Sequence, residues 1–411
     1  MKIYRVGGCV RDRLLGLPVK DIDWVVTGAT VEQMLSLGYK SIGKDFPVFL
    51  HPDSKQEYAL ARSERKTGPG YTGFEINADP ATTIEQDLLR RDLTINAMAE
   101  DEDGNIVDPY GGQRDIEDRL LRHVSAAFVE DPVRVLRVAR FAARYHSLGF
   151  TVADDTRDLI REIGESGELE ALVAERVWSE LSRALDEADP AVFFTTLRDC
   201  GVLARLFPEI DDLFGVPQNP KYHPEIDTGL HVMMALQQSA ALGQENETRF
   251  AVLMHDLGKA TTPAEVLPSH YGHEARGNKP VKEFCKRWRV PKAHTELALI
   301  TTELHLLAHR SRELKASTLL KLLTRADALR KPARFQKMLD ACLADVRGRK
   351  GGENDAYPQA QFLTDLVDRL RSLDITEFQQ QGLSGKAMGE AIYDARLRLI
   401  KQQKELLDKA G

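Results

Sequence analysis

A glycine pair near the N-terminus constrains this chain most, because it lies where a strand pattern gives way to a helical one. A short apolar run ends at Val6, Gly7 and Gly8 follow, and the next turn carries Arg11. Glycine has no Cβ, so backbone N–H groups at such a turn can approach a phosphate, and the helix N-terminus favours the anion. The stretch therefore predicts a strand, a phosphate-binding turn and a helix.

Two acids follow the glycine pair. Asp21 and Asp23 alternate in front of an apolar run that begins at Trp24. Because a strand has a period of two, we expect both carboxylates on one face of a buried strand, where they need a partner. Two hard oxygen ligands suit Mg²⁺ that carries a nucleoside triphosphate. The alternative is a turn with two solvated acids on an edge strand. Glu57, on a later strand, is either a third carboxylate or an ordinary surface residue.

Length and composition set broad limits. A chain of 411 residues is too long for one core, so we expect two to four domains. Its 4 cysteines are far apart, which predicts reduced, packed thiols rather than a zinc ribbon or disulfides. We expect no signal peptide and no membrane span, and hence a cytoplasmic protein. The net charge of −7 does not exclude a nucleic-acid partner, because a local basic face is sufficient.

A second informative segment runs from Thr83 to Ala99, with apolar residues at helical spacing. Arg91, Asp92 and Asn96 lie off the apolar stripe. An arginine can bind a triphosphate with two parallel hydrogen bonds, and Asp92 or Asn96 can meet a ribose hydroxyl. An exposed helix face with Arg–Asp pairs is the alternative, which the N-terminal motif disfavours.

A third segment, which follows Pro132, predicts an amphipathic helix with one basic ridge. Its arginines are spaced three, three and four residues apart: Arg134, Arg137, Arg140 and Arg144. Such arginines repel one another unless phosphates or acidic neighbours are present. We expect phosphate or nucleotide contact, with a solvated helix as the alternative.

A fourth constellation consists of His231, the adjacent His255 and Asp256, and Asp327. Two imidazoles and two carboxylates from separate helices suit an octahedral divalent metal that activates water against a phosphate. A lone histidine would more often be a packed or surface residue, but the adjacent pair followed by Gly258 and Lys259 is more specific. Three further histidines are weaker candidates for the same pocket: His270, His273 and His305.

These patterns predict an α+β chain: a small α/β head, an all-α body and a further all-α domain. We expect segments at 1–140, 141–222, 223–335 and 336–411, the last one helical and without a basic tail.

Taken in order, the motifs resemble those of the bacterial tRNA nucleotidyltransferase (CCA-adding enzyme) family of class II, in the form with a C-terminal HD domain. The matching motifs are Gly7-Gly8 with Arg11 and Asp12, Asp21-x-Asp23, Arg90 to Asn96, Asp108 to Gly112, Glu130 to Arg134 with Arg137 and Arg140, and the histidine–aspartate constellation. The resemblance implies a polymerase-β-like head. It also implies that CTP and ATP are added to the 3′ end of tRNA without a nucleic-acid template.

The resemblance also implies roles for single residues. Asp21 and Asp23 would hold Mg²⁺. The side chains or backbone that contact the nucleotide would be Gly8, Arg11, Arg91, Asp131, Arg134, Arg137 and Arg140. The HD domain would use Ni²⁺ or another transition metal on His231, His255, Asp256 and Asp327, and would hydrolyse 2′,3′-cyclic phosphates, 2′-nucleotides and phosphomonoesters. A bacterial poly(A) polymerase and a non-catalytic tRNA-binding module are the rival interpretations. A monomer and a homodimer are both open.

Overall fold

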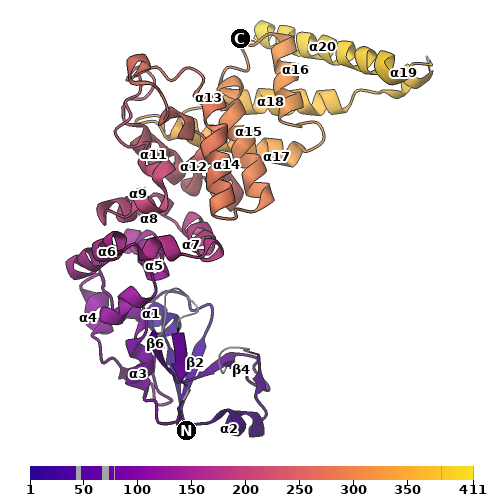
Figure 1. Cartoon of the computed structure of the whole chain (residues 1–411). Helices are drawn as coiled ribbons and strands as arrows, with labels where there is room; N and C mark the ends of the chain where they lie inside the picture. Colours follow the sequence, from indigo (N-terminus) through magenta and orange to yellow (C-terminus); the bar gives the residue numbers. More distant parts are fainter. Residues whose placement is uncertain (43–47, 67–73, 78, 381, 411) are drawn as a thin grey trace. The chain divides into compact units, whose positions relative to one another are not determined.

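The glycine pair joins the first strand to the first helix, as the sequence predicts. The computed structural model describes residues 1–42, 48–66, 74–77, 79–380 and 382–410. Strand β1 (Lys2–Val6) passes through Gly7 into α1 (Gly8–Leu14), and β2 (Asp23–Thr27) returns antiparallel to β1 (Figure 1). Gly7 has φ 69°, a conformation that residues with a Cβ rarely adopt.

These strands form the centre of a mixed seven-stranded sheet. Its order is β3-β4-β5-β2-β1-β8-β9, in which β2 and β5 are parallel. The further members are β3 (Lys40–Ser41), β4 (Val48–Leu50), β5 (Glu57–Leu60), β8 (Ala99–Glu100) and β9 (Ile106–Val107). Two helices accompany the sheet: α2 (Val31–Ser36) and α3 (Ile84–Leu89). After β5, the strands β6 (Ser63–Lys66) and β7 (Phe74–Asn77) pair as a separate antiparallel hairpin. Residues 67–73 and 78 lie outside the described ones.

Helices complete the first unit, which ends at Leu206. The helix expected across 83–99 is interrupted: α3 ends at Leu89, and a 3-10 turn, η1 (Thr94–Asn96), follows. The principal helices are α4 (Gly112–Glu117), α5 (Val133–Tyr145), α6 (Asp154–Ser166), α7 (Ala174–Asp186) and α8 (Pro190–Asp199). The boundary expected after residue 140 falls inside α5.

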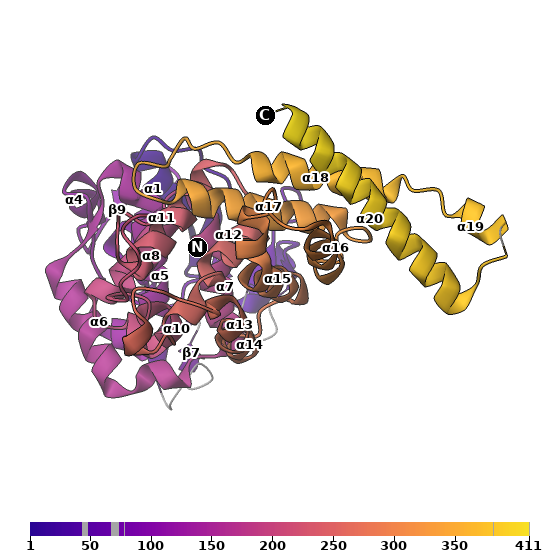
Figure 2. The same cartoon turned by 90° about the horizontal axis from the view of Figure 1, so that it is seen from above.

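The described residues of the second unit, Phe207–Gly411, form helices and an isolated β-bridge between Pro217 and Asp227. Its helices include α11 (Thr228–Ala241), α12 (Asn246–Met254), α13 (His273–Arg276), α15 (Lys292–His309), α16 (Ala316–Arg325), α17 (Pro332–Arg347), α18 (Pro358–Arg371) and α20 (Gly385–Ala410). Figure 2 shows α20 beside α16 and α18, and its Ile400 is fully buried in the same core as α15 and α17. The boundary expected after residue 335 falls inside α17.

The predicted α+β class, with a small head followed by helices, is confirmed. All four cysteines are free and buried, as their spacing indicates. Among the described residues, no helix has both the length and the apolar character that a membrane span requires.

A glycine sets the distance between α11 and α17. A Cβ at Gly348, directly after α17, would lie 2.4 Å from the Cα of Ala235 on α11. Gly348 has φ −75°, so an alanine there meets no backbone strain and only this clash. The two helices can therefore pack closely only with glycine at this position.

We expect Gly348→Ala to lower the free energy of unfolding by about 1–3 kcal/mol, because α17 must move away from α11. Gly389→Ala is the matched control: it lies within α20, its Cβ would meet no atom within 4 Å, and it should stabilise by about 0.4–1 kcal/mol. Urea denaturation followed by circular dichroism measures both effects. Equal stability of the two variants would contradict the packing argument.

Candidate functional sites

The first two acids lie at the glycine end of the sheet. The register of β1 and β2 pairs Val6 with Asp23, so Asp23 begins its strand beside the turn at Gly7. Asp21 precedes β2, and both acids are exposed, whereas the buried residues of the strand are Val25 and Val26. The expectation of two carboxylates within one buried strand is therefore wrong. Exposed carboxylates keep their water and need no partner, so only their position beside the turn supports a metal site.

Glu57 lies level with Asp23. In the parallel pair of β2 and β5, Trp24 is opposite Tyr58, and their rings stack with centroids 5.3 Å apart. Because successive side chains alternate between faces, the preceding residues, Asp23 and Glu57, share the other face. Both are exposed. Three acids thus gather at one end of the sheet, with oxygen atoms of the kind that Mg²⁺ prefers.

The side chains of two arginines pack at the glycine turn. A Cβ on Gly7 would lie 2.6 Å from Nη1 of Arg91, so the absence of that Cβ makes room for the guanidinium. Arg11 is only 4% exposed: its Nε donates to Asp12 at 2.8 Å, and its guanidinium lies 5.3 and 5.2 Å from the rings of Phe141 and Tyr145. Arg11 therefore ties α1 to α5.

Asp92 is a buried acceptor between two segments. Its carboxylate accepts from Nδ2 of Asn96 at 2.9 Å and from Nε of Arg137 at 2.7 Å. Burial by itself raises the pKa of Asp92, but the Arg137 guanidinium and these hydrogen bonds outweigh burial and hold the pKa well below its usual value. The segment before η1 is thereby fixed to α5.

The basic ridge of α5 faces acids from other elements. Arg140 donates through Nε to Glu180 on α7 at 2.6 Å and lies 3.8 Å from Glu187, whereas Arg144 lies 3.7 Å from Asp12. Acidic neighbours therefore relieve the repulsion from which phosphate contact was inferred. The ridge holds the helices together whether or not it also binds a nucleotide.

The start of α5 presents Asp131 and Arg134. Asp131 accepts two hydrogen bonds from Arg176 on α7, at 3.0 and 2.7 Å. Arg134 donates to the backbone carbonyls of Ala127 and Arg90, at 3.1 and 2.5 Å. Both side chains are thus oriented by the protein itself.

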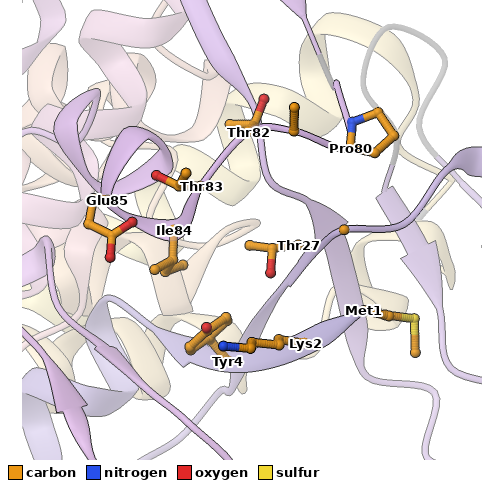
Figure 3. Close-up of a pocket in the computed structure, with 11 residues that line it drawn as sticks. Met1, Lys2, Tyr4, Thr27, Pro80, Thr82, Thr83, Ile84 and Glu85 are labelled. Atoms are coloured by element: carbon orange, nitrogen blue, oxygen red, sulfur yellow. The ribbon is translucent and has the colours of Figure 1, made fainter.

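A pocket of ≈ 410 Å³ lies at the opposite ends of β1 and β2 from Val6 and Asp23 (Figure 3). Lys2, Tyr4, Thr27 and Glu85 are among its lining residues. It includes none of the candidate residues above. This pocket is therefore separate from the acids at the glycine end of the sheet.

The second unit gathers a buried cluster of histidines and acids. His231 on α11 and His255, directly after α12, place their Nε2 atoms 3.0 and 3.8 Å from Oδ1 of Asp345 on α17. The Oδ2 atom of Asp256 lies 3.1 Å from Nε2 of His255 and 4.0 Å from Nε2 of His231. The ligand atoms of His231, His255 and Asp345 all lie within 4.8 Å of one another, and the Asp256 carboxylate adjoins them, so one ion can lie among these side chains.

The prediction of Asp327 as the fourth ligand needs correction. Asp327 follows α16 with φ 54°, and its carboxylate binds Arg330 at 2.7 Å, outside the buried cluster. Asp345 occupies the expected place instead, at 5% exposure. The sequence offered one signal for it: Asp345 lies in an apolar helical pattern and precedes Gly348, which allows α17 to approach α11.

Hydrogen bonds fix which nitrogen each imidazole presents. Nδ1 of His255 lies 2.7 Å from the carbonyl of Val252, which can only accept, so Nδ1 carries the proton and Nε2 faces the acids. Glu225 lies 2.9 Å from Nδ1 of His231, whose Nε2 faces Asp345. Burial raises the pKa of Glu225, but His231 reverses this and lowers it to about 2.

The cluster requires positive charge. Burial lowers the pKa of His255, yet the neighbouring Asp256 carboxylate raises it to about 9. Nε2 of His255 and both oxygens of Asp256 are buried without a hydrogen-bond partner of good geometry. Lys259 places its Nζ 2.6 Å from Oδ2 of Asp256. A divalent cation fits this donor set of imidazole nitrogens and carboxylate oxygens.

The chain resembles known proteins over its whole length. The family described as "Poly A polymerase head domain" matches residues 3–122, "Probable RNA and SrmB- binding site of polymerase A" matches 149–214, and "HD domain" matches 228–331. A multifunctional CCA protein of Thioalkalivibrio sulfidiphilus is 58% identical over 404 residues, which cover 98% of this chain and 99% of that protein. A multifunctional CCA protein of Teredinibacter turnerae is 56% identical over 401 residues, which cover 98% of this chain and 98% of that protein.

Solved structures share the fold. A CCA-adding enzyme with ATP superposes with a TM-score of 0.65 at 21% identity and covers 98% of this chain and 87% of that one. The Thermotoga maritima CCA-adding enzyme complexed with tRNA gives a TM-score of 0.59 at 22% identity. This match covers 99% of the present chain and 91% of that enzyme.

We expect Asp92→Asn to destabilise the first unit at pH 7 by about 1–3 kcal/mol, because Arg137 loses its charged acceptor. The pKa of Asp92 is lowered in the folded chain. Its ionised carboxylate therefore contributes fully to the free energy of unfolding above the unfolded pKa of about 3.9, and this contribution is lost as the pH falls through the folded pKa. The difference from the parent should stay constant between pH 5 and 8 and shrink only below about pH 4.

The control for this measurement is Asp154→Asn, since Asp154 is 96% exposed and 3.7 Å from Arg157. Exposed pairs contribute about 0–1 kcal/mol, so this variant should unfold near the parent's urea midpoint. A loss in Asp92→Asn no larger than in the control would show that the buried pair does not fix α5.

Proposed function

Because the chain belongs to the family of multifunctional CCA proteins, we propose that it builds and repairs the 3′-terminal CCA of tRNA from CTP and ATP. The position of Asp23 carries the proposal: the strand register places this acid beside a glycine turn against which Arg91 packs. A nucleoside triphosphate needs this combination of an oxygen-ligand site for a metal, backbone N–H groups at the start of a helix and a guanidinium. The 54–58% identical relatives favour CCA addition over poly(A) synthesis.

The first unit's residues have separate tasks in this reaction. The tRNA 3′ oxygen attacks the α-phosphate, and the bond to pyrophosphate breaks. Asp21 and Asp23 would hold Mg²⁺, which neutralises the phosphates when bound. Gly8 offers backbone N–H, and Arg91 binds phosphate or sugar. Arg11, buried against α5, supports the turn more than it reaches the triphosphate.

Selection of the base falls to the start of α5. The Asp131 carboxylate can accept from an exocyclic amine and Arg134 can donate to ring acceptors, which suits cytosine and adenine but not uracil or guanine. Arg176 holds Asp131 through two hydrogen bonds, so an incoming base competes with a guanidinium that already fixes the direction of the carboxylate. Arg137 and Arg140 keep α5 anchored to Asp92 and Glu180.

The second unit acts as a metal-dependent phosphohydrolase. His231, His255, Asp256 and Asp345 would hold the ion, which supplies an activated water and polarises the phosphate when bound. Imidazole ligands suit Ni²⁺, Co²⁺ or Mn²⁺ better than Mg²⁺. Lys259, only 6% exposed and beside Asp256, is placed to bind a phosphate oxygen. Its substrates are 2′,3′-cyclic phosphates, 2′-nucleotides and phosphomonoesters at damaged RNA ends.

The two activities should separate by mutation. We expect Asp23→Ala to abolish CCA addition and to spare hydrolysis of 2′,3′-cyclic AMP, whereas His255→Ala should do the reverse, because each side chain belongs to a different unit. The assay is incubation of tRNA that lacks its terminal nucleotides with each NTP singly, followed by product sequencing, beside a Ni²⁺-supplemented cyclic-phosphate assay. Loss of both activities in either folded variant would refute separate sites. Addition of long A tracts would instead favour a poly(A) polymerase.

Asp131→Ala and Arg134→Ala should each relax the preference for CTP and ATP over UTP and GTP, by about 1–3 kcal/mol per lost base-edge contact. The measurement is kcat/KM for each NTP on a matched tRNA. Glu130→Ala changes the neighbouring acid and should retain the preference. Unaltered discrimination in both of the first two variants would show that the base is selected elsewhere.

A further inference from the structure

The two oxygens of Asp256 face different sets of histidines. Oδ2 lies nearest to His255 and His231, the proposed metal ligands. Oδ1 lies 3.2 Å from Nε2 of His273 on α13 and 3.8 Å from Nε2 of His305 on α15. The ligand atoms of Asp256, His273 and His305 all lie within 4.8 Å of one another. A second donor set thus adjoins the first and shares only the Asp256 carboxylate with it.

The protonation of this second set is fixed by its surroundings. Nδ1 of His273 lies 2.8 Å from the carbonyl of His270, and Nδ1 of His305 lies 3.1 Å from the carbonyls of Thr301 and Thr302. A carbonyl can only accept, so both Nδ1 atoms carry a proton, and in the neutral imidazoles both Nε2 atoms present lone pairs. These Nε2 atoms are 3.3 Å apart and both face Oδ1 of Asp256.

Burial makes this arrangement unfavourable without a cation. The exposed fractions of Asp256, His273 and His305 are 1%, 4% and 2%, so water does not solvate the three converging acceptors. Lys259 is 2.6 Å from Oδ2 and neutralises that side of the carboxylate. Oδ1 is the Asp256 oxygen that lies nearest to the imidazoles of His273 and His305. Buried acceptors that converge in this way are typical of metal ligands.

A backbone contact holds the second set in place. A Cβ at Gly258 would lie 2.0 Å from the carbonyl oxygen of His273 and 2.6 Å from the backbone nitrogen of Gly277. The turn after Asp256 therefore packs directly on α13, and Nε2 of His273 is kept near Oδ1. This explains why the adjacent His255-Asp256 pair is followed by a glycine.

We propose that the second unit binds two divalent transition-metal ions, bridged by Asp256, with His273 and His305 as the ligands of the second ion. The inference deepens the proposed hydrolase and rests on its first metal ion. A carboxylate that bridges two ions holds them about 3.5–4 Å apart, a spacing at which both can bind one phosphate. Such a pair suits hydrolysis in which a water oxygen bonds to phosphorus, the bond from phosphorus to one ribose oxygen breaks, and that oxygen takes up a proton.

Metal stoichiometry tests this proposal without relying on activity. The full chain carrying Asp23→Ala, which removes the head's metal ligand, is titrated with Mn²⁺, and bound ions are counted after gel filtration. We expect two ions per chain and the electron paramagnetic resonance spectrum of an exchange-coupled Mn²⁺ pair. His273→Ala and His305→Ala in this background should each bind one ion and lose the coupling. His270→Ala is the control, because its ring contacts Thr262 and Pro217 instead, and it should keep two.

The outcomes separate this proposal from the proposed function. One uncoupled ion in the Asp23→Ala parent, with hydrolysis of 2′,3′-cyclic AMP intact, would overturn the second site and leave the hydrolase standing; this result needs no further variant to fold. Two coupled ions without any hydrolysis would support the metal pair and refute the hydrolase. Two ions retained in both His273→Ala and His305→Ala, with melting temperatures near the parent's, would also overturn the assignment.

Discussion

Both proposed sites depend on close contacts at glycines that a Cβ would block. At Gly7 the space of a missing side chain is filled by the Arg91 guanidinium, and at Gly258 it is filled by the backbone of His273. Gly348 lets two helices pack closely, since the absence of its Cβ leaves room for Ala235 of α11 against the end of α17. Each contact brings a charged or metal-binding group next to residues far away in the sequence. The glycines therefore determine the chemistry although they contribute none of the reacting side chains.

Charge compensation follows a different rule in each unit. In the first unit, buried charges are paired within the protein: Asp92 with Arg137, and Glu180 with Arg140. Such pairs are complete, so they fix the position of α5 and need no ligand. In the second unit, acids and imidazole nitrogens converge, and Lys259 is a lysine partner of Asp256. The first pattern builds a rigid support, whereas the second leaves buried donor groups that could hold a cation.

Local spacing predicted the elements that carry the residues but not always their surroundings. The strand–turn–helix at the N-terminus and the helix that follows Pro132 formed as expected, because periodicity and glycine conformation are local properties. The exposure of Asp23 differs from the prediction. The apolar run that follows it predicts that the middle of the strand is buried, but it does not determine whether the first residue of the strand is buried. Nor did spacing reveal that Asp12, Glu180 and Glu187 neutralise the arginines of α5, since these acids come from other elements.

By itself, the sequence determined which residue types could do the chemistry: the glycine pair, the spaced acids, the basic ridge and the adjacent His255 and Asp256. Only the tertiary structure decided how the proposed metal ligands group. Asp345 rather than Asp327 meets His231, and His273 and His305 meet the other oxygen of Asp256. The reason is physical: metal ligation requires side chains within a few ångströms of one another, and helix packing, not spacing along the chain, sets those distances.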